Sequence, residues 1–245
     1  MQEEQPVKPA NIANIVATNQ GLLPLTMEIP VAKPLTAEQV EAFMAEGHII
    51  VDTRSSPDFG SGHIPGAFHA HLSSPEFEQR VGWVTPLDTP LILVTNSEEE
   101  AQKAIYNLAF LALDGRVTGY LDDGMEAWMD AGKAMTTVPQ MDVYSLRDRL
   151  SSNGLQVLDV REDDEYEDGH IEVAQNLSFK LIPTRLDTLG LNPEVPLAIT
   201  CATGKRSSTA ASMLLRQGFG ELYNVTGGMA AWESADFDTV FGLEE

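Results

Sequence analysis

The sequence has very little cysteine: Cys201 is the one thiol among 245 residues. A single thiol cannot form an intramolecular disulfide, and it cannot supply the several sulfur ligands of a cysteine-based zinc site. A reducing, cytoplasmic compartment is therefore the simplest setting, and we expect no metal and no other cofactor. Long hydrophobic runs are absent too, because no stretch approaches the roughly 18 apolar residues of a membrane span. The amino-terminal residues are acidic and contain no long apolar segment, so we expect no secretory signal and no membrane association.

Basic residues are also scarce. The chain has 15 Lys and Arg against 37 Asp and Glu, which gives a net charge of -22 and an isoelectric point near 4.4. Such an acidic surface repels phosphate backbones, so we do not expect general binding to nucleic acids. The apolar share of 43% and the mean hydropathy of -0.12 are typical of a globular chain. The length suggests one large domain or two small ones.

An internal repeat favours two domains. Four segments recur in the same order, at offsets of 104 to 107 residues. The pairs are VDTR at 51–54 with LDVR at 158–161, GHIPGAFHA at 62–70 with GHIEVAQNL at 169–177, TPLILVT at 89–95 with VPLAITC at 195–201, and GYLDDGMEAW at 119–128 with YNVTGGMAAW at 223–232. Self-similarity of this kind does not depend on residue propensities, so it predicts two copies of one unit of about 100 residues.

Each copy alternates short apolar runs with helical spacing. That alternation is typical of an α/β fold in which a small, mostly parallel sheet is flanked by helices. In the first copy Thr36 and Gln39 have the spacing of a helix capping box. We predict an extended leader or connector over 1–34, a first domain over 35–134 and a second over 135–245.

The position of Cys201 points to chemistry. It ends the apolar strand 195–200 and opens a short loop before a helix predicted over 207–217. In parallel sheets, ligands bind beyond the carboxyl ends of the strands. Gly204 can adopt the left-handed turn that aims loop amides inward, and Lys205 and Arg206 add positive charge. The amides and the positive charge together favour the thiolate form of Cys201. We therefore expect Cys201 to be a nucleophile rather than an inert core residue.

The motifs LDVRE, GHI, CATGKRS and GGMAAW, in this order, resemble those of the rhodanese family of sulfurtransferases in its tandem two-domain form. The resemblance covers about 35–245 and implies that Cys201 carries a persulfide. It implies a loop that binds the sulfur donor, made of Ala202, Thr203, Gly204, Lys205, Arg206 and Ser207. We interpret Asp159 and Arg161 as a supporting ion pair below this loop.

The implied reaction moves a sulfane sulfur from thiosulfate or a low-molecular-weight persulfide to a thiophilic acceptor. The acidic stretch 162–166 disfavours thiosulfate as the donor. One alternative is a sulfur carrier or binding module that does not turn over small molecules. A second is a cysteine phosphatase or arsenate reductase, but these need five residues between Cys and Arg, whereas Cys201 and Arg206 have four between them.

The first copy departs from the family pattern at the decisive position. Thr95 stands where the second copy has Cys201, and three glutamates at 98–100 replace the cationic loop. No thiolate can form there, and an anionic donor would be repelled. We predict that the first domain is degenerate and not catalytic. His69 and His71 are a weak metal candidate in this copy, because no third ligand stands near them in the sequence.

The order of an inactive domain followed by an active one also resembles the rhodanese portion of fusions with a metallo-β-lactamase-type domain, which are similar to persulfide dioxygenases. This second resemblance implies a persulfide-producing or metallo-β-lactamase-type partner, besides the small sulfur donors and acceptors. The chain itself contains no HxHxD run that would mark such a metal domain.

Overall fold

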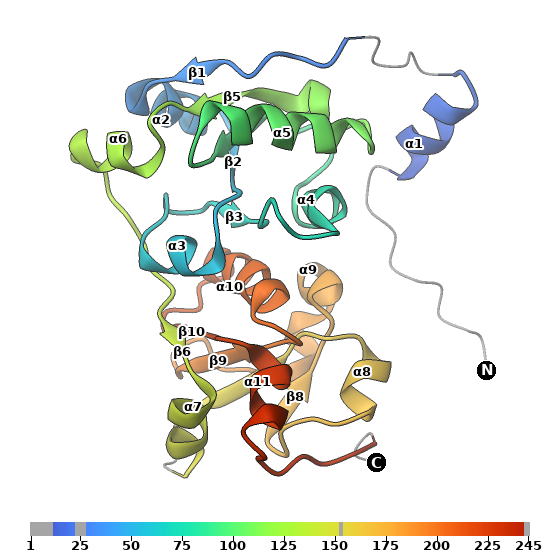
Figure 1. Cartoon of the computed structure of the whole chain (residues 1–245), viewed down its shortest axis with the longest axis vertical. Coiled ribbons are helices and arrows are strands. Elements are labelled where there is room, and N and C mark those ends of the chain that lie inside the picture. The colour runs from blue at the N-terminus through green and yellow to red at the C-terminus, as the bar shows by residue number, and fades with distance from the viewer. Residues whose placement is uncertain (1–11, 23–27, 152–153, 243–245) are drawn as a thin grey trace. The chain divides into compact units, whose positions relative to one another are not determined.

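The computed structural model describes residues 12–22, 28–151 and 154–242. The chain divides into two compact units (Figure 1). The first unit runs to Ser55 and resumes from His63 to Met135. The second contains Ser56–Gly62 and the chain from Thr136 onward.

Within its described residues, the first unit holds a five-stranded sheet in the order β1-β5-β4-β2-β3, with every neighbouring pair parallel. All residues of the central strands β2 and β4 are buried, as expected for apolar strands covered on both faces. The strands are β1 (Pro34–Leu35), β2 (Ile49–Asp52), β3 (Phe68–His69), β4 (Leu91–Val94) and β5 (Val117–Leu121). The helices are α2 (Ala37–Ala45), α4 (Phe77–Val84), α5 (Glu98–Ala109), η1 (Asp114–Arg116) and α6 (Gly124–Asp130).

The second unit repeats this topology: its described strands form a parallel sheet in the order β6-β10-β9-β7-β8. The strands are β6 (Gln140–Met141), β7 (Gln156–Asp159), β8 (Ala174–Asn176), β9 (Leu197–Thr200) and β10 (Leu222–Val225). The helices are α7 (Val143–Leu150), α8 (Asp163–Glu167), η2 (Phe179–Leu181), α9 (Ile182–Arg185), η3 (Leu186–Leu189), α10 (Lys205–Arg216) and α11 (Gly228–Ser234). The equivalent strand orders confirm the predicted pair of α/β domains with small parallel sheets flanked by helices.

One helix of the first repeat packs with the second unit. The helix α3 (Ser56–Ser61) follows β2 in sequence, yet its contacts place it in the second unit. The Val138 amide donates to the Gly60 carbonyl over 2.9 Å. A Cβ atom on Gly60 would lie 2.5 Å from the Val138 carbonyl oxygen and would overlap the Gln140 amide nitrogen, so this close approach requires glycine.

The leader is not extended throughout, so this part of the prediction is wrong. Helix α1 spans Ile12–Asn19. Its segment IANIVATN has no proline or glycine, and apolar residues recur three and four positions apart, which suits a helix. Ile12 and Val16 are exposed. Among the described residues, no helix has the length and apolar character to cross a membrane.

Candidate active site

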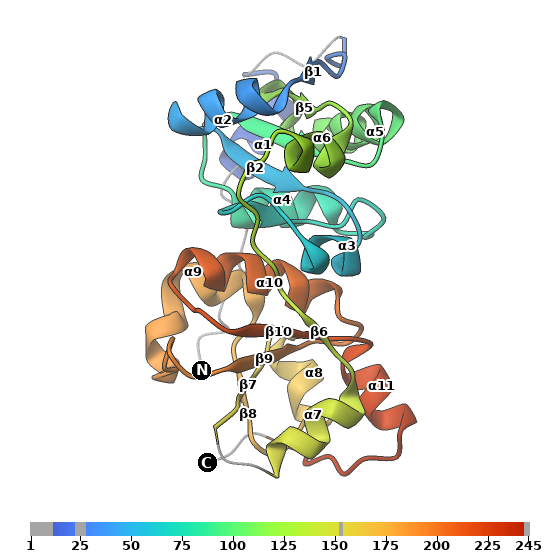
Figure 2. The same cartoon turned by 90° about the vertical axis from the view of Figure 1, so that its left-hand side faces the viewer.

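The cysteine loop sits at the carboxyl end of the central strand β9. Cys201 follows the last residue of β9, and α10 begins four residues later at Lys205, lying beside β9 and β10 (Figure 2). Gly204 precedes the helix with a φ of 88°, in the left-handed region that favours glycine. A Cβ atom there would lie 3.1 Å from the Val225 carbonyl oxygen. The loop therefore makes a tight turn against the end of β10.

The turn brings polar groups to the sulfur. The Gly204 amide donates to Cys201 Sγ over 3.1 Å, and Ser207 Oγ lies 3.4 Å from the same sulfur. The sequence led us to expect several such amides, and within the described residues Gly204 supplies the one found. Cys201 itself is buried, with an exposed fraction of only 1%. In the loop around it Thr203 is exposed, Ala202 and Lys205 are half-buried, and Ser207 is buried.

The GGMAAW motif supports this loop from behind. The amides of Met229 and Ala230 donate to the carbonyls of Cys201 and Ala202, over 2.8 and 3.1 Å. Gly228 has a φ of 54°, and a Cβ atom on it would overlap the Cys201 carbonyl oxygen. The motif therefore fixes the backbone of the cysteine loop through α11 rather than contributing a reactive side chain.

Arg206 is held by a carboxylate. Its Nη1 and Nη2 donate to the two carboxylate oxygens of Glu165 on α8, over 2.5 and 2.6 Å. This contact lowers the pKa of Glu165, against the opposing effect of partial burial. Nearby, Lys180 Nζ lies 2.9 Å from a carboxylate oxygen of Glu162. Both cations are therefore balanced by carboxylates. From the sequence, the acidic stretch 162–166 is expected only to repel an anionic donor. The structure shows that Glu165 of this stretch binds Arg206.

Asp159 and Arg161 form a buried ion pair below the loop. Arg161 Nε and Nη2 donate to the Asp159 carboxylate over 2.9 and 2.7 Å, and Nη2 also donates to the Gly169 carbonyl over 2.8 Å. The first unit repeats the pair with Asp52 and Arg54. Each pair compensates a buried carboxylate at the end of a strand with an arginine two residues later, which explains the Asp and Arg of VDTR and LDVR. In the second unit, Arg161 also binds the first residue of the GHI motif.

Sequence reasoning missed two polar residues behind Cys201, Asn224 and Gln140. Ser207 Oγ donates to Asn224 Oδ1 over 2.6 Å, and Asn224 Nδ2 donates to Gln140 Oε1 over 2.8 Å. Asn224 is 1% exposed at the end of β10. A polar residue inside the otherwise apolar run before Gly227 was the signal that could have found it.

The equivalent loop in the first unit has a different geometry. Thr95 follows β4, and its hydroxyl donates to the Ser97 carbonyl over 2.8 Å. Helix α5 begins three residues after Thr95, one fewer than in the second unit, and no glycine precedes it. A cavity of about 340 Å³ opens here, and its ionisable lining groups are Glu98, Tyr120, Asp122 and Asp123. Burial raises the pKa of Tyr120, and these carboxylates raise it further.

The histidines of the first unit do not gather as a metal site. His69 Nε2 lies 2.9 Å from the Arg54 carbonyl oxygen, which can only accept, so Nε2 carries the proton. Burial lowers the pKa of His69 to about 3, so the ring is neutral at physiological pH. Across the part of the chain that the structure describes, no three His, Cys, Asp or Glu side chains form a metal-binding group.

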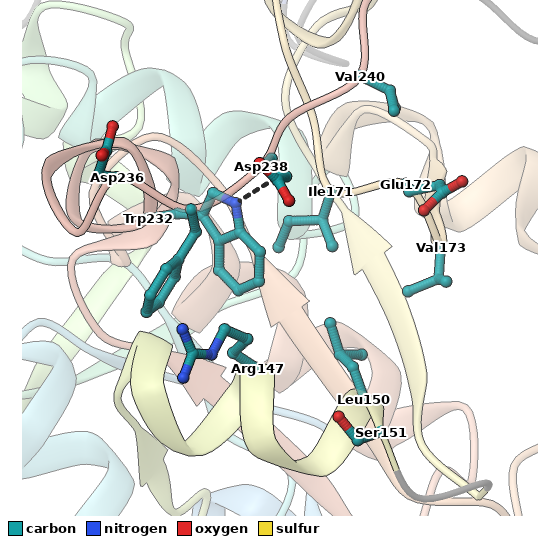
Figure 3. Close-up of a pocket in the computed structure, with 11 residues that line it drawn as sticks. Arg147, Leu150, Ser151, Ile171, Glu172, Val173, Trp232, Asp236, Asp238 and Val240 are labelled. Carbon is teal, nitrogen blue, oxygen red and sulfur yellow. Dashed lines mark hydrogen bonds between the residues drawn. The ribbon is translucent and has the colours of Figure 1, made fainter.

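A separate cavity of about 380 Å³ lies between α7, the end of α11 and the loop 171–173 of the second unit (Figure 3). Its wall includes Trp232, whose Nε1 donates to the Asp238 carbonyl over 3.0 Å, and Arg147, whose guanidinium carbon lies 4.5 Å from the Phe237 ring centre. No residue of the cysteine loop lines it. The Cys201 loop therefore lies outside this cavity.

The protein therefore consists of two α/β units in tandem, each built on a parallel sheet. The second unit has a cysteine loop at the carboxyl end of its central strand. Sequence comparison places it more closely: residues 36–131 and 142–235 each match the family model described as "Rhodanese-like domain". The chain belongs to this family.

Individual relatives are more distant. GlpE of Shewanella oneidensis, named a thiosulfate sulfurtransferase, is 28% identical over 102 residues, 42% of this chain and 99% of that protein. YrkF of Bacillus subtilis (strain 168), named provisionally as a sulfur carrier protein, is 33% identical over 98 residues, 40% of this chain and about half (52%) of its own length. A solved rhodanese-like domain protein from Staphylococcus aureus is 32% identical, covering 39% of this chain and 91% of that chain with a TM-score of 0.36.

We predict that Thr95→Cys does not create a second active site. The introduced thiol would face the carboxylates around the cavity, and no left-handed glycine would aim an amide at it. In a Cys201→Ser background, Thr95→Cys should leave sulfurtransferase activity at the level of Cys201→Ser alone, while thiol titration shows that the new thiol is present. Activity restored to that of the wild-type chain would contradict this account of the first unit.

Proposed function

We propose that the second unit is a sulfurtransferase that works through a persulfide on Cys201. The observation that carries the proposal is the 3.1 Å contact from the Gly204 amide to the sulfur, in a tight turn before α10. A backbone donor aimed at sulfur stabilises the thiolate and the charge that returns to it during transfer. Membership of the rhodanese-like family supports the same chemistry.

The proposed reaction is a double displacement. The Cys201 thiolate attacks the outer sulfur of the donor, so a sulfur–sulfur bond forms as the donor's own sulfur–sulfur bond breaks. The electron pair of the broken bond leaves with sulfite, when the donor is thiosulfate, or with a thiolate, when it is a persulfide. An acceptor thiolate, cyanide or sulfite then attacks the terminal sulfur of the Cys201 persulfide and regenerates the thiolate. No external oxidant or reductant is consumed.

The charges around the loop favour a donor of low charge. Glu165 balances Arg206 and Glu162 balances Lys180, so neither of these two cations offers a full charge to an anion. Lys205 is the remaining basic side chain of the loop. Thiosulfate carries two negative charges, whereas an alkyl persulfide carries one. We infer that persulfides, or a protein that delivers one, are better donors than thiosulfate.

The first unit has no catalytic part in this proposal, because Thr95 supplies no thiol. A persulfide-producing partner, including one of the metallo-β-lactamase type, fits the inferred donor. The relatives named above give no support to a fusion with such a domain, so that resemblance stays a prediction, as does the cytoplasmic compartment.

A non-turnover sulfur carrier is the second candidate. The 1% exposure of Cys201 favours it, since a buried thiol suits transfer between docked proteins, and the name of YrkF offers the same role for that protein. A phosphatase is disfavoured, because Arg206, which would have to bind the oxyanion, is bound by both oxygens of Glu165.

We predict steady-state turnover with glutathione persulfide and cyanide above the uncatalysed rate, and no increase over that rate with Cys201→Ser. The measurement is thiocyanate formation over many equivalents of enzyme, because a carrier would stop after one. Formation limited to a single equivalent would favour the carrier. Phosphate release from a model ester, lost in Cys201→Ser, would instead support the phosphatase.

We predict that Glu165→Gln improves the use of thiosulfate. The change removes the charge that balances Arg206, so kcat/KM with thiosulfate should rise roughly threefold to tenfold. With a singly charged alkyl persulfide the change should be smaller. Glu167→Gln is the matched control, because Glu167 is exposed on the same helix and its loss changes the net charge equally. Equal effects of the two variants, or a fall with thiosulfate, would contradict the inferred charge balance.

A further inference from the structure

A buried chain of polar side chains leads away from the Cys201 sulfur. Ser207 Oγ lies 3.4 Å from Cys201 Sγ and donates to Asn224 Oδ1 over 2.6 Å. Ser207 is 0% exposed and Asn224 1% exposed, so water does not compete at either side chain. From Asn224 the chain continues to Gln140 and to the backbone of helix α3. None of the motifs found in the sequence contains Gln140, and none gave a role to Asn224.

Backbone carbonyls fix the direction of this chain. Asn224 Nδ2 donates to the Gly204 carbonyl over 3.1 Å, and a carbonyl can only accept, so the Asn224 amide cannot be turned over. Gln140 Nε2 likewise donates to the carbonyls of Val138 and Ser56, over 3.1 and 3.4 Å. Gln140 Oε1 therefore faces Asn224 Nδ2, and Asn224 Oδ1 faces Ser207 as a fixed acceptor.

This direction creates a competition for one hydrogen atom. The Ser207 hydroxyl has a single hydrogen, with Asn224 Oδ1 on one side and the Cys201 sulfur on the other. While Cys201 is a thiol, its S–H can donate to Ser207 Oγ, and Ser207 donates to Asn224. When the thiol proton leaves to solvent, the sulfur becomes an acceptor only. Ser207 can then stabilise the thiolate only by turning its hydrogen away from Asn224.

We propose that Asn224 restrains the ionisation of Cys201 by competing for the Ser207 hydroxyl hydrogen, which makes Ser207 and Asn224 positioning residues for the nucleophile. Ser207 gives the thiolate a second donor beside the Gly204 amide. Asn224 sets how readily that donor is released, and Gln140 holds Asn224 in the competing orientation. The proposal deepens the proposed function, because it concerns the activation of the same thiol.

The charged groups around the loop are separate from the competition between Asn224 and Cys201 for the Ser207 hydrogen. The elements that pack around it carry these groups: Asp58 on α3, Asp159 at the end of β7 and Arg161 after it, Glu165 on α8, Lys180 on η2, Arg185 on α9, Lys205 and Arg206 on α10, Tyr223 on β10 and Glu233 on α11. In the pairs Asp159–Arg161 and Glu165–Arg206, the arginine donates to both oxygens of the carboxylate. The side chain of Asn224 contacts none of these groups among the described hydrogen bonds, so a change at Asn224 leaves them in place.

The test is the pH at which Cys201 ionises, followed by thiolate ultraviolet absorbance with Cys201→Ser as the blank. Asn224→Leu removes the competing acceptor, so ionisation should move to lower pH by about half to one unit. Ser207→Ala removes the donor and should move it to higher pH. In the Ser207→Ala background, Asn224→Leu should cause no further movement, because the effect travels through Ser207.

Asn176→Leu is the matched control. Asn176 is an asparagine at the end of β8 whose Nδ2 donates to the Asp159 and Arg161 carbonyls, and it should leave the ionisation unchanged. If Asn224→Leu does not fold, Asn224→Ala makes the same test. The proposal would be overturned if loss of Asn224 left the ionisation pH of Cys201 unchanged or raised it. It would also be overturned if Asn224→Leu shifted that pH by the same amount in the Ser207→Ala background.

The absorbance measurement needs no sulfur donor, so the two proposals can fail separately. If the coupling between Asn224 and Ser207 is found but the wild-type chain takes up no sulfur, the proposed function alone fails. If sulfur is transferred and the coupling is absent, the competition alone fails.

Discussion

The chemistry proposed for Cys201 depends on one hydrogen bond, from the Gly204 amide to the Cys201 sulfur. The cysteine follows strand β9 at the carboxyl end of the sheet, and the left-handed conformation at Gly204 turns the chain back so that its amide faces the sulfur. A residue with a Cβ atom at this position would be strained and would approach the Val225 carbonyl oxygen. The rest of the second unit serves to keep this short turn in place.

Three sets of contacts constrain the turn from different sides. The start of α11 binds the carbonyls of Cys201 and Ala202, and the absence of a side chain at Gly228 allows that approach. Asn224 binds the Gly204 carbonyl, and Ser207 bridges Asn224 and the sulfur. In the first unit the corresponding loop is one residue shorter and rich in carboxylates, so duplication of the fold did not preserve the turn. The two repeats therefore share the sheet but not the turn that follows its central strand.

The sequence was sufficient for the fold, and for the position of the nucleophile in it. The repeat of motifs predicted two copies of one domain. The buried apolar strands and the helices α5 and α10 follow directly from residue patterns. The short edge strands β1, β3, β6 and β8 have two or three residues each, too few for a periodic signal. Helix α1 was missed because the prolines around it suggested an extended chain.

The finer arrangement of the site could not be predicted for a physical reason. Glu165, Gln140 and Asn224 act on the loop through contacts between residues 17 to 84 positions apart, and no local pattern encodes such pairs. The packing of helix α3 with the second unit is likewise a tertiary contact. The adjacent basic residues Lys205 and Arg206 indicated a positively charged loop. The fold was needed to reveal that Glu165 balances the charge of Arg206.

The most direct measurement of the central claim is the intact mass of the chain after incubation with a persulfide donor. The account predicts a gain of about 32 Da, one sulfur atom, that is lost on addition of an acceptor thiol and never forms in Cys201→Ser. An unchanged mass with every donor, or a gain that persists without the Cys201 thiol, would contradict it.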